Sequence, residues 1–154
     1  MDFRTRRTSL AEPERSDRPE AERFRRVREA HQTELAEDYV ELIDDLITET
    51  GEARVVDLAE RLGVSSATVN NAIQRLQRDG LVTTKPYRAI FLTERGQDMA
   101  ALARERHRLV VELLLALGVD AGTAEVDAEG IEHHVSEATL AAFRAFLEAR
   151  REER

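Results

Sequence analysis

The sequence predicts a mainly α-helical protein with a small β-wing, in which a winged helix-turn-helix domain precedes a helical dimerisation domain. Three observations support this fold class. Two short helical segments within residues 55–78 are joined by a turn that contains glycine. The residues that follow alternate in the manner of a β-hairpin. From Thr93 onward the apolar residues return to helical spacing, and the composition of 35% charged and 5% aromatic residues is typical of a helical, water-soluble chain.

The first predicted helix runs from about Ala21 to Thr50. This stretch contains neither glycine nor proline, its apolar residues recur at helical spacing, and Gly51 follows it. Residues 1–20 have two prolines, balanced charges and few apolar anchors, so we expect a disordered N-terminal arm. Such an arm is either merely solvated or a DNA-groove contact made by its arginines, Arg4, Arg6 and Arg7.

The helix-turn-helix prediction rests on residues 55–62 and 66–78, which flank the turn Gly63-Val64-Ser65. A hairpin is predicted directly after it, with strands in residues 81–84 and 89–92. A hairpin in this place is a wing, which makes the pattern more specific than a helix-turn-helix alone. The alternative is a helical hairpin that only packs against the rest of the chain.

The predicted second helix leaves polar, donor-rich side chains exposed, and these suit contacts with DNA bases and phosphates. The formal net charge of −8 argues against nucleic-acid binding, but residues 65–88 hold four cationic side chains and one acid. The acidity therefore lies elsewhere. The candidate DNA-binding residues are Ser65, Ser66, Thr68, Asn70, Asn71, Gln74, Arg75 and Arg78, with Lys85 and Arg88 on the wing.

The C-terminal third is predicted to hold three further helices. Thr93 caps a helix that runs to about Leu117, and residues 120–123 are expected to form a linker. A helix bearing the segment DAEGIEHH of residues 127–134 follows, and Ser136 caps the last helix. The apolar stripe of that last helix indicates core or dimer surface, and it comprises Leu140, Phe143, Phe146 and Leu147.

The segment DAEGIEHH also carries a candidate metal cluster. Glu129, Glu132 and His133 are spaced i, i+3, i+4, so on a helix their side chains converge on one face. Oxygen donors mixed with imidazole, in a chain without cysteine, favour manganese or iron(II) over soft-ligand metals. His134 is expected to orient a ligand from outside the cluster. Taken alone, Asp38 and Glu41 indicate a solvated acidic face and His107 an exposed histidine.

With these pieces assembled, the chain resembles the diphtheria-toxin-repressor family of metal-dependent regulators, in particular its manganese transport regulator branch. The resemblance covers roughly residues 30–150. It is carried by AEDYVELI at 36–43, the winged helix at about 52–96, RERH at 104–107 and DAEGIEHHVS at 127–136. Because the sequence stops soon after the last predicted helix, we do not expect the SH3-like third domain of iron-responsive members. The arm before Glu22 departs from shorter relatives.

The resemblance implies a metal site and a mode of action. Its implied ligands are Asp38, Glu41, His107, Glu129, Glu132 and His133. Four carboxylates and two imidazoles could hold a pair of close Mn²⁺ ions in each subunit, and Fe²⁺ overlaps in preference. The implied protein is a manganese-activated repressor of manganese-uptake genes, a homodimer whose recognition helices reach successive major grooves of double-stranded operator DNA. The expected division is an arm at 1–20, a DNA-binding domain at 21–96 and a metal-binding and dimerisation domain at 97–154.

Two other classes of function share some of these features. A metallohydrolase also uses paired carboxylates with histidines, but no nucleophile or phosphate-binding loop accompanies them, so we expect no enzyme. A winged-helix regulator that responds to a small organic ligand, with incidental carboxylates, is the other alternative. No run of 18 apolar residues and no signal-peptide core occurs, and a cytoplasmic protein without membrane contact is expected.

Overall fold

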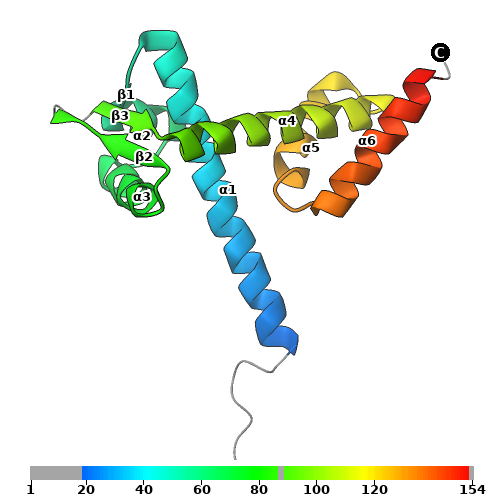
Figure 1. Cartoon of the computed structure of the whole chain (residues 1–154), viewed down its shortest axis with the longest axis horizontal. Coiled ribbons are helices and arrows are strands. Elements are labelled where there is room, and N and C mark those ends of the chain that lie inside the picture. Colours follow the sequence, from blue (N-terminus) through cyan, green and yellow to red (C-terminus); the bar gives the residue numbers. More distant parts are fainter. Residues whose placement is uncertain (1–18, 87–88, 153–154) are drawn as a thin grey trace, which may run out of the picture.

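A computed structural model describes residues 19–86 and 89–152 of the chain. Figure 1 shows two helical lobes joined by one long helix, with a small sheet at the outer edge of the first lobe. This arrangement confirms the predicted fold class. In chain order the elements are α1 (Pro19–Thr50), β1 (Ala53–Arg54), α2 (Val55–Leu62), α3 (Ser66–Arg78), β2 (Val82–Thr84), β3 (Ala89–Leu92), α4 (Glu94–Ala116), α5 (Ala121–Ile131) and α6 (Glu137–Glu152).

Helix α1 begins two residues earlier than the sequence predicted. Pro19 opens it, which is the helical position where a missing backbone N–H costs least. Gly51 ends it with a φ of 86°, in the left-handed region that glycine adopts without strain. The rest of the predicted arm, residues 1–18 with Arg4, Arg6 and Arg7, lies outside the described residues. In Figure 1 the first half of α1 projects away from both lobes.

The helix-turn-helix has the predicted boundaries. Gly63 stands in the left-handed conformation at the end of α2, and the Ser65 hydroxyl accepts a hydrogen bond from the Thr68 backbone N–H at the start of α3. The wing is a three-stranded antiparallel sheet in the order β1-β3-β2, in which Thr83 faces Phe91. Strand β1 was not predicted, because a two-residue strand is too short to show alternation.

Each lobe has its own hydrophobic core. The first core lies between α1, α2, α3 and the sheet, and Ile43, Leu58 and Ile90 are almost fully buried in it. The second core lies between α4, α5 and α6 and includes Val110 and Leu140. Burying a side chain of this size stabilises the fold by about 1.5–3 kcal/mol. Helix α4 packs against both α1 and α5, so it joins the lobes.

Helix α5 differs from the prediction at both ends. The expected linker at 120–123 is wrong, because the Asp120 carboxylate accepts a hydrogen bond from the Thr123 backbone N–H and so caps a helix that begins at Ala121. The helix ends at Ile131, so Glu132 is its C-cap and His133 lies in the following turn. Glu132 keeps helical angles, with φ −58° and ψ −32°. The candidate ligands therefore leave a helix end, where the chain can turn toward α1.

No helix in the described part of the chain is long and apolar enough to cross a membrane.

Candidate metal centre

The six predicted ligands come from three elements that meet where the lobes join. Helix α1 carries Asp38 and Glu41, and α4 carries His107. The end of α5 and the turn after it supply the other three, Glu129, Glu132 and His133. Because α4 packs on both α1 and α5, residues 22 to 95 positions apart in sequence become neighbours.

Glu132 is at the middle of this cluster. Its side chain is 2% exposed. One carboxylate oxygen lies 2.6 Å from Nδ1 of His107, and the other lies 3.4 Å from Nε2 of His133. A carboxylate is rarely buried without charged or hydrogen-bonding partners, and here it has an imidazole on each side. Glu132 thus connects the α4 histidine to the histidine that faces α1.

His133 is the more deeply buried of the two histidines, with a side chain 2% exposed. Its Nε2 lies 3.7 Å from a carboxylate oxygen of Asp38 as well as near Glu132. Its Nδ1 lies 2.8 Å from Glu37. The same Glu37 oxygen accepts a hydrogen bond from the Arg106 guanidinium, so this carboxylate is held between an arginine and an imidazole.

His107 has a similar arrangement nearer the surface, with a side chain 21% exposed. Its Nδ1 lies 3.7 Å from Glu129 in addition to its short contact with Glu132. Its Nε2 lies 2.9 Å from Glu125, one turn earlier on α5. Donor atoms of His107, Glu129 and Glu132 all lie within 4.8 Å of one another, the spacing of groups that can share an ion.

The donor set fits a divalent cation on two grounds. First, each imidazole has one nitrogen on predicted ligands and the other on a carboxylate outside that set, Glu37 or Glu125. Histidines that bind metals are oriented in this way, because the outer carboxylate fixes the tautomer. Second, two ligands about 2.1 Å from one ion in a tetrahedral or octahedral array lie about 3.0–3.4 Å apart. The Asp38, Glu129 and Glu132 contacts of 3.4–3.7 Å are close to that separation.

Electrostatics also favour a cation here. Burial, together with the charges of Glu132, Glu129 and Asp38, raises the pKa of Glu41 to about 7. Burial raises the pKa of Asp38, and the nearby charges of Glu34 and Glu129 add to it. Burial likewise raises the pKa of Glu132, despite the opposing effect of His107. Carboxyl groups that hold protons this tightly are ones whose negative charges lack sufficient compensation.

Arginines of α4 hold α1 in place beside the cluster. The Arg104 guanidinium forms ion pairs with Asp44 and Asp45 and donates to the Glu41 backbone carbonyl at 3.4 Å. Among the described residues, the Glu41 carboxylate itself forms no ion pair. Its carboxylate is therefore left without a permanent cationic partner.

Sequence reasoning missed Glu37 and Glu125. Glu37 is 6% exposed although it precedes the exposed Asp38 in a run of acids, and no periodicity distinguishes a buried acid from a solvated one. The predicted role of His134 was wrong. Its Nε2 lies 3.6 Å from Glu34, which is not one of the predicted ligands.

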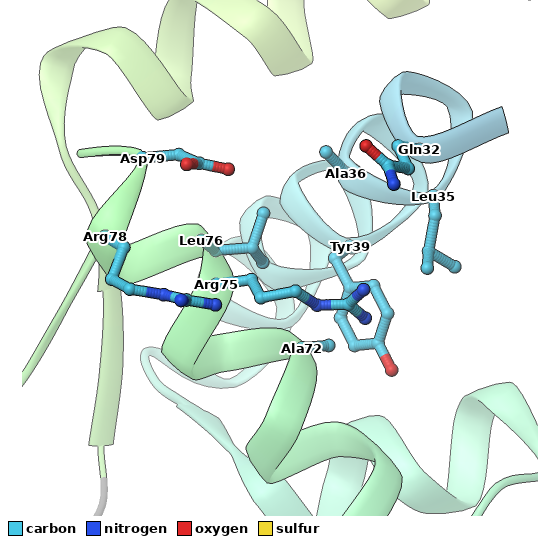
Figure 2. A pocket seen from close by; sticks show the side chains of 9 residues that line it. All are labelled: Gln32, Leu35, Ala36, Tyr39, Ala72, Arg75, Leu76, Arg78 and Asp79. Carbon is cyan, nitrogen blue, oxygen red and sulfur yellow. The ribbon is translucent and has the colours of Figure 1, made fainter. Parts of the chain in front are cut away.

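The predicted DNA surface lies on α3. All eight candidates from Ser65 to Arg78 are exposed, although the Ser65 hydroxyl also serves as the helix cap. On the wing, the Lys85 ammonium lies 4.8 Å above the Phe91 ring, and Arg88 lies outside the described residues. An open cavity of about 360 Å³ lies beside α3, away from the candidate metal ligands. Figure 2 shows Arg75 and Arg78 of α3 along it and Leu35, Ala36 and Tyr39 of α1 on its other side.

Comparison with known families covers most of the chain. A model of the iron dependent repressor N-terminal DNA binding domain matches residues 31–90, and a model of the iron dependent repressor metal binding and dimerisation domain matches residues 93–153. The transcriptional regulator MntR of Escherichia coli O157:H7 is 57% identical over 127 residues, which is 82% of each chain. The HTH-type transcriptional regulator MntR of Listeria monocytogenes serotype 4b is 40% identical over 68% of this chain and 73% of its own.

Solved structures of similar fold include manganese regulators. A manganese-dependent transcriptional repressor in complex with manganese is 32% identical, with a TM-score of 0.63 over 73% of this chain and 52% of its own. The manganese regulator SloR is 29% identical, with a TM-score of 0.63 over 73% of this chain and 53% of its own. The present chain spans about half the length of these two structures.

Proposed function

Because the chain belongs to the iron dependent repressor family of metal-dependent transcriptional regulators, we propose that it is a manganese-activated repressor of manganese-uptake genes. The observation that carries the choice of metal is the donor set around Glu132, in which three carboxylates contact the two imidazoles, the charge of Glu41 lies nearby and no cysteine is present. The similarity to curated MntR proteins supports the same choice. Iron(II) remains the alternative metal within the family.

The proposed ligands are Asp38, Glu41, His107, Glu129, Glu132 and His133. One carboxylate oxygen of Glu132 lies near each histidine, so Glu132 could bridge two ions. A set of six donors with a bridging carboxylate suits two neighbouring ions in each subunit. Manganese(II), when bound, would supply the positive charge that this cluster of carboxylates lacks. Glu37 and Glu125 would each accept a hydrogen bond from one ring nitrogen and so fix the ring orientation, so that Nε2 of His133 and Nδ1 of His107 face the carboxylates.

The proposed coupling between metal and DNA runs through α1. In the ion-free protein, Asp38 and Glu41 of α1 are repelled by Glu129 and Glu132, which weakens the packing of α1 on α4 and α5. Neutralising that charge fixes α1, and α1 packs directly on the helix-turn-helix through the first core. In a homodimer this would hold the two α3 helices at the spacing of successive major grooves.

The remaining expectations form part of the same proposal. The DNA contacts are assigned to the exposed face of α3 and to the wing, including Lys85 and Arg88. The division into an arm at 1–20, a DNA-binding domain at 21–96 and a metal-binding and dimerisation domain at 97–154 places the metal ligands on both sides of the domain boundary. A repressor acts where the genome is, which places this protein in the cytoplasm.

The test is binding to a fluorescent DNA duplex from upstream of the manganese-uptake genes of the same genome. We expect the chelator-treated protein to bind weakly and added MnCl₂ to raise the affinity at least tenfold. Parallel titrations with iron(II), zinc and cobalt would rank the metals. Equal affinity with and without every metal would contradict a metal-dependent regulator, and a response to iron(II) alone would assign the alternative metal.

A regulator that responds to an organic ligand would use a different place in the molecule. The cavity between α1 and α3, with apolar side chains on one wall and Arg75 and Arg78 on the other, is where an anionic organic effector would fit. A Tyr39→Ala variant separates the two mechanisms. A manganese response that survives in this variant, at whatever basal affinity, favours the metal mechanism.

A further inference from the structure

We propose that His31, Glu34 and His134 form a separate binding site for a divalent transition-metal ion of the zinc class. Glu34 lies on α1, three residues after His31, and His134 lies in the turn between α5 and α6. Both imidazoles approach the same carboxylate oxygen of Glu34, His31 through Nδ1 at 3.4 Å and His134 through Nε2 at 3.6 Å. The trio shares no residue with the manganese ligands proposed above.

The two distances are too long for normal hydrogen bonds and leave room for a shared ion. Both exceed the 2.7–3.2 Å of a normal N–H···O bond. They are close to the separation of about 3.4 Å between two ligands that each lie about 2.1 Å from a tetrahedral ion. The two histidine contacts to Glu34 thus have the spacing of ligands that bind one metal ion.

Binding requires the exposed side chains to turn toward one another. The trio is more open than the His107, Glu129 and Glu132 group, so the two imidazoles must turn toward each other. The His31 side chain is 82% exposed and that of His134 is 53% exposed, so both rings are free to rotate. Glu34, at 26% exposed, is the more fixed member and supplies the anchor.

The donor chemistry selects the ion. Two neutral imidazoles and one carboxylate, with water in the remaining position, form a borderline donor set that suits Zn²⁺. The proposed manganese site is richer in carboxylates, with four for two imidazoles, and so favours a harder ion. For the same ligands zinc binds more tightly than manganese, so zinc also competes for the manganese ligands and a test of the trio must remove that competition.

An ion in this position would connect the projecting part of α1 to the turn that carries His133. Glu34 lies one helical turn before Asp38, and His134 is the residue after His133. An ion held by the trio would therefore connect the same two elements that the manganese cluster joins, at the outer edge of that cluster. Zinc held by this trio is expected to stabilise the junction.

The test measures zinc bound by the full-length, chelator-treated protein, using equilibrium dialysis against ZnCl₂ and metal analysis. To remove zinc binding by the proposed manganese ligands, the test variant and its reference protein both carry Glu129→Ala and Glu132→Ala, and this double variant is called the background. We expect this background to keep one zinc per chain, and the further substitution His31→Ala to weaken that binding at least tenfold. Gln32→Ala, an exposed neighbour on α1, is the matched control and should bind zinc as the background does.

A second measurement identifies the ligand atoms in the otherwise unaltered chain. The chain has four histidines, so long-range ¹H–¹⁵N spectra resolve each ring nitrogen. Zinc is expected to shift Nδ1 of His31 and Nε2 of His134. Unchanged zinc binding in the His31→Ala variant, or unshifted nitrogens in both rings, would overturn the proposal. Neither readout uses DNA or manganese, so a failure of the proposed function would be seen separately.

Discussion

The two histidines of the candidate metal centre have the same kind of partners but very different surroundings. His133 is held by Glu37, which is itself buried and paired with Arg106. His107 is held by Glu125, whose side chain is 62% exposed. The carboxylate that orients His133 is thus fixed by the interior of the protein, whereas the one that orients His107 competes with water.

This difference indicates where the site is rigid and where it can adapt. An ion pair screened by water contributes little, whereas removing one partner of a buried pair leaves the other unsatisfied. His133 and Asp38 together connect the turn after α5 to α1, so the rigid half of the site is the half that faces the DNA-binding lobe. The His107 half lies within the second lobe, between α4 and α5.

The largest effect should come from Glu132, because it serves both halves. Glu132→Gln keeps the shape of the side chain but removes the charge between the two imidazoles. We expect Mn²⁺ affinity to fall more than about 100-fold and manganese-dependent DNA binding to be lost. Calorimetric Mn²⁺ titration measures the first, and circular dichroism checks the fold. Tight Mn²⁺ binding by this variant would rule out Glu132 as the shared ligand.

Glu37→Gln tests the rigid half alone. The amide can accept only weakly from Arg106 and no longer carries the charge that orients His133, so we expect Mn²⁺ affinity to fall roughly 10–100-fold. The free energy of unfolding should also fall, by about 1–3 kcal/mol, because the Arg106 guanidinium loses its charged partner. Urea unfolding of the ion-free protein measures this. Full Mn²⁺ affinity in a folded variant would show that the orientation of His133 does not depend on Glu37.

Proton competition should be clearest at Glu41 and His107. Glu41 has a pKa of about 7, so its carboxyl group is protonated below that pH and must lose the proton to bind a cation. Burial lowers the pKa of His107, but the hydrogen bond to Glu125 and the charge of Glu132 outweigh it and raise the pKa. Mn²⁺ affinity should therefore rise with pH, by about tenfold between pH 6 and pH 8 from Glu41 alone.

Glu41→Gln is the control for this pH dependence. The variant should bind Mn²⁺ more weakly at pH 8 and show a shallower slope between pH 6 and pH 8. An unchanged slope would place the titrating proton on another group.

Glu125→Gln should have the smallest effect and is the matched partner of Glu37→Gln. Because Glu125 is exposed, its contact with His107 contributes about 0–1 kcal/mol, and we expect at most about a fivefold loss of Mn²⁺ affinity. Its urea unfolding should match that of the unsubstituted protein. If Glu125→Gln and Glu37→Gln proved equally damaging, burial would not be what distinguishes the two halves.

The sequence alone determined the architecture and the kinds of donor atoms. Turn glycines and capping residues such as Gly51, Gly63 and Ser65 act locally, so the helix-turn-helix and its wing could be predicted from neighbouring residues. The spacing of Glu129, Glu132 and His133 and the lack of cysteine likewise indicate a hard-donor metal site, because donor type is a property of each side chain.

Only the tertiary structure decided which atoms face one another. The helix end at Ile131 turned His133 toward α1, which did not follow from periodicity. The roles of Glu37 and Glu125 depend on partners up to 96 residues away. One acidic side chain resembles another in sequence, and only packing separates a buried, paired carboxylate from a solvated one, because burial is a property of the whole fold.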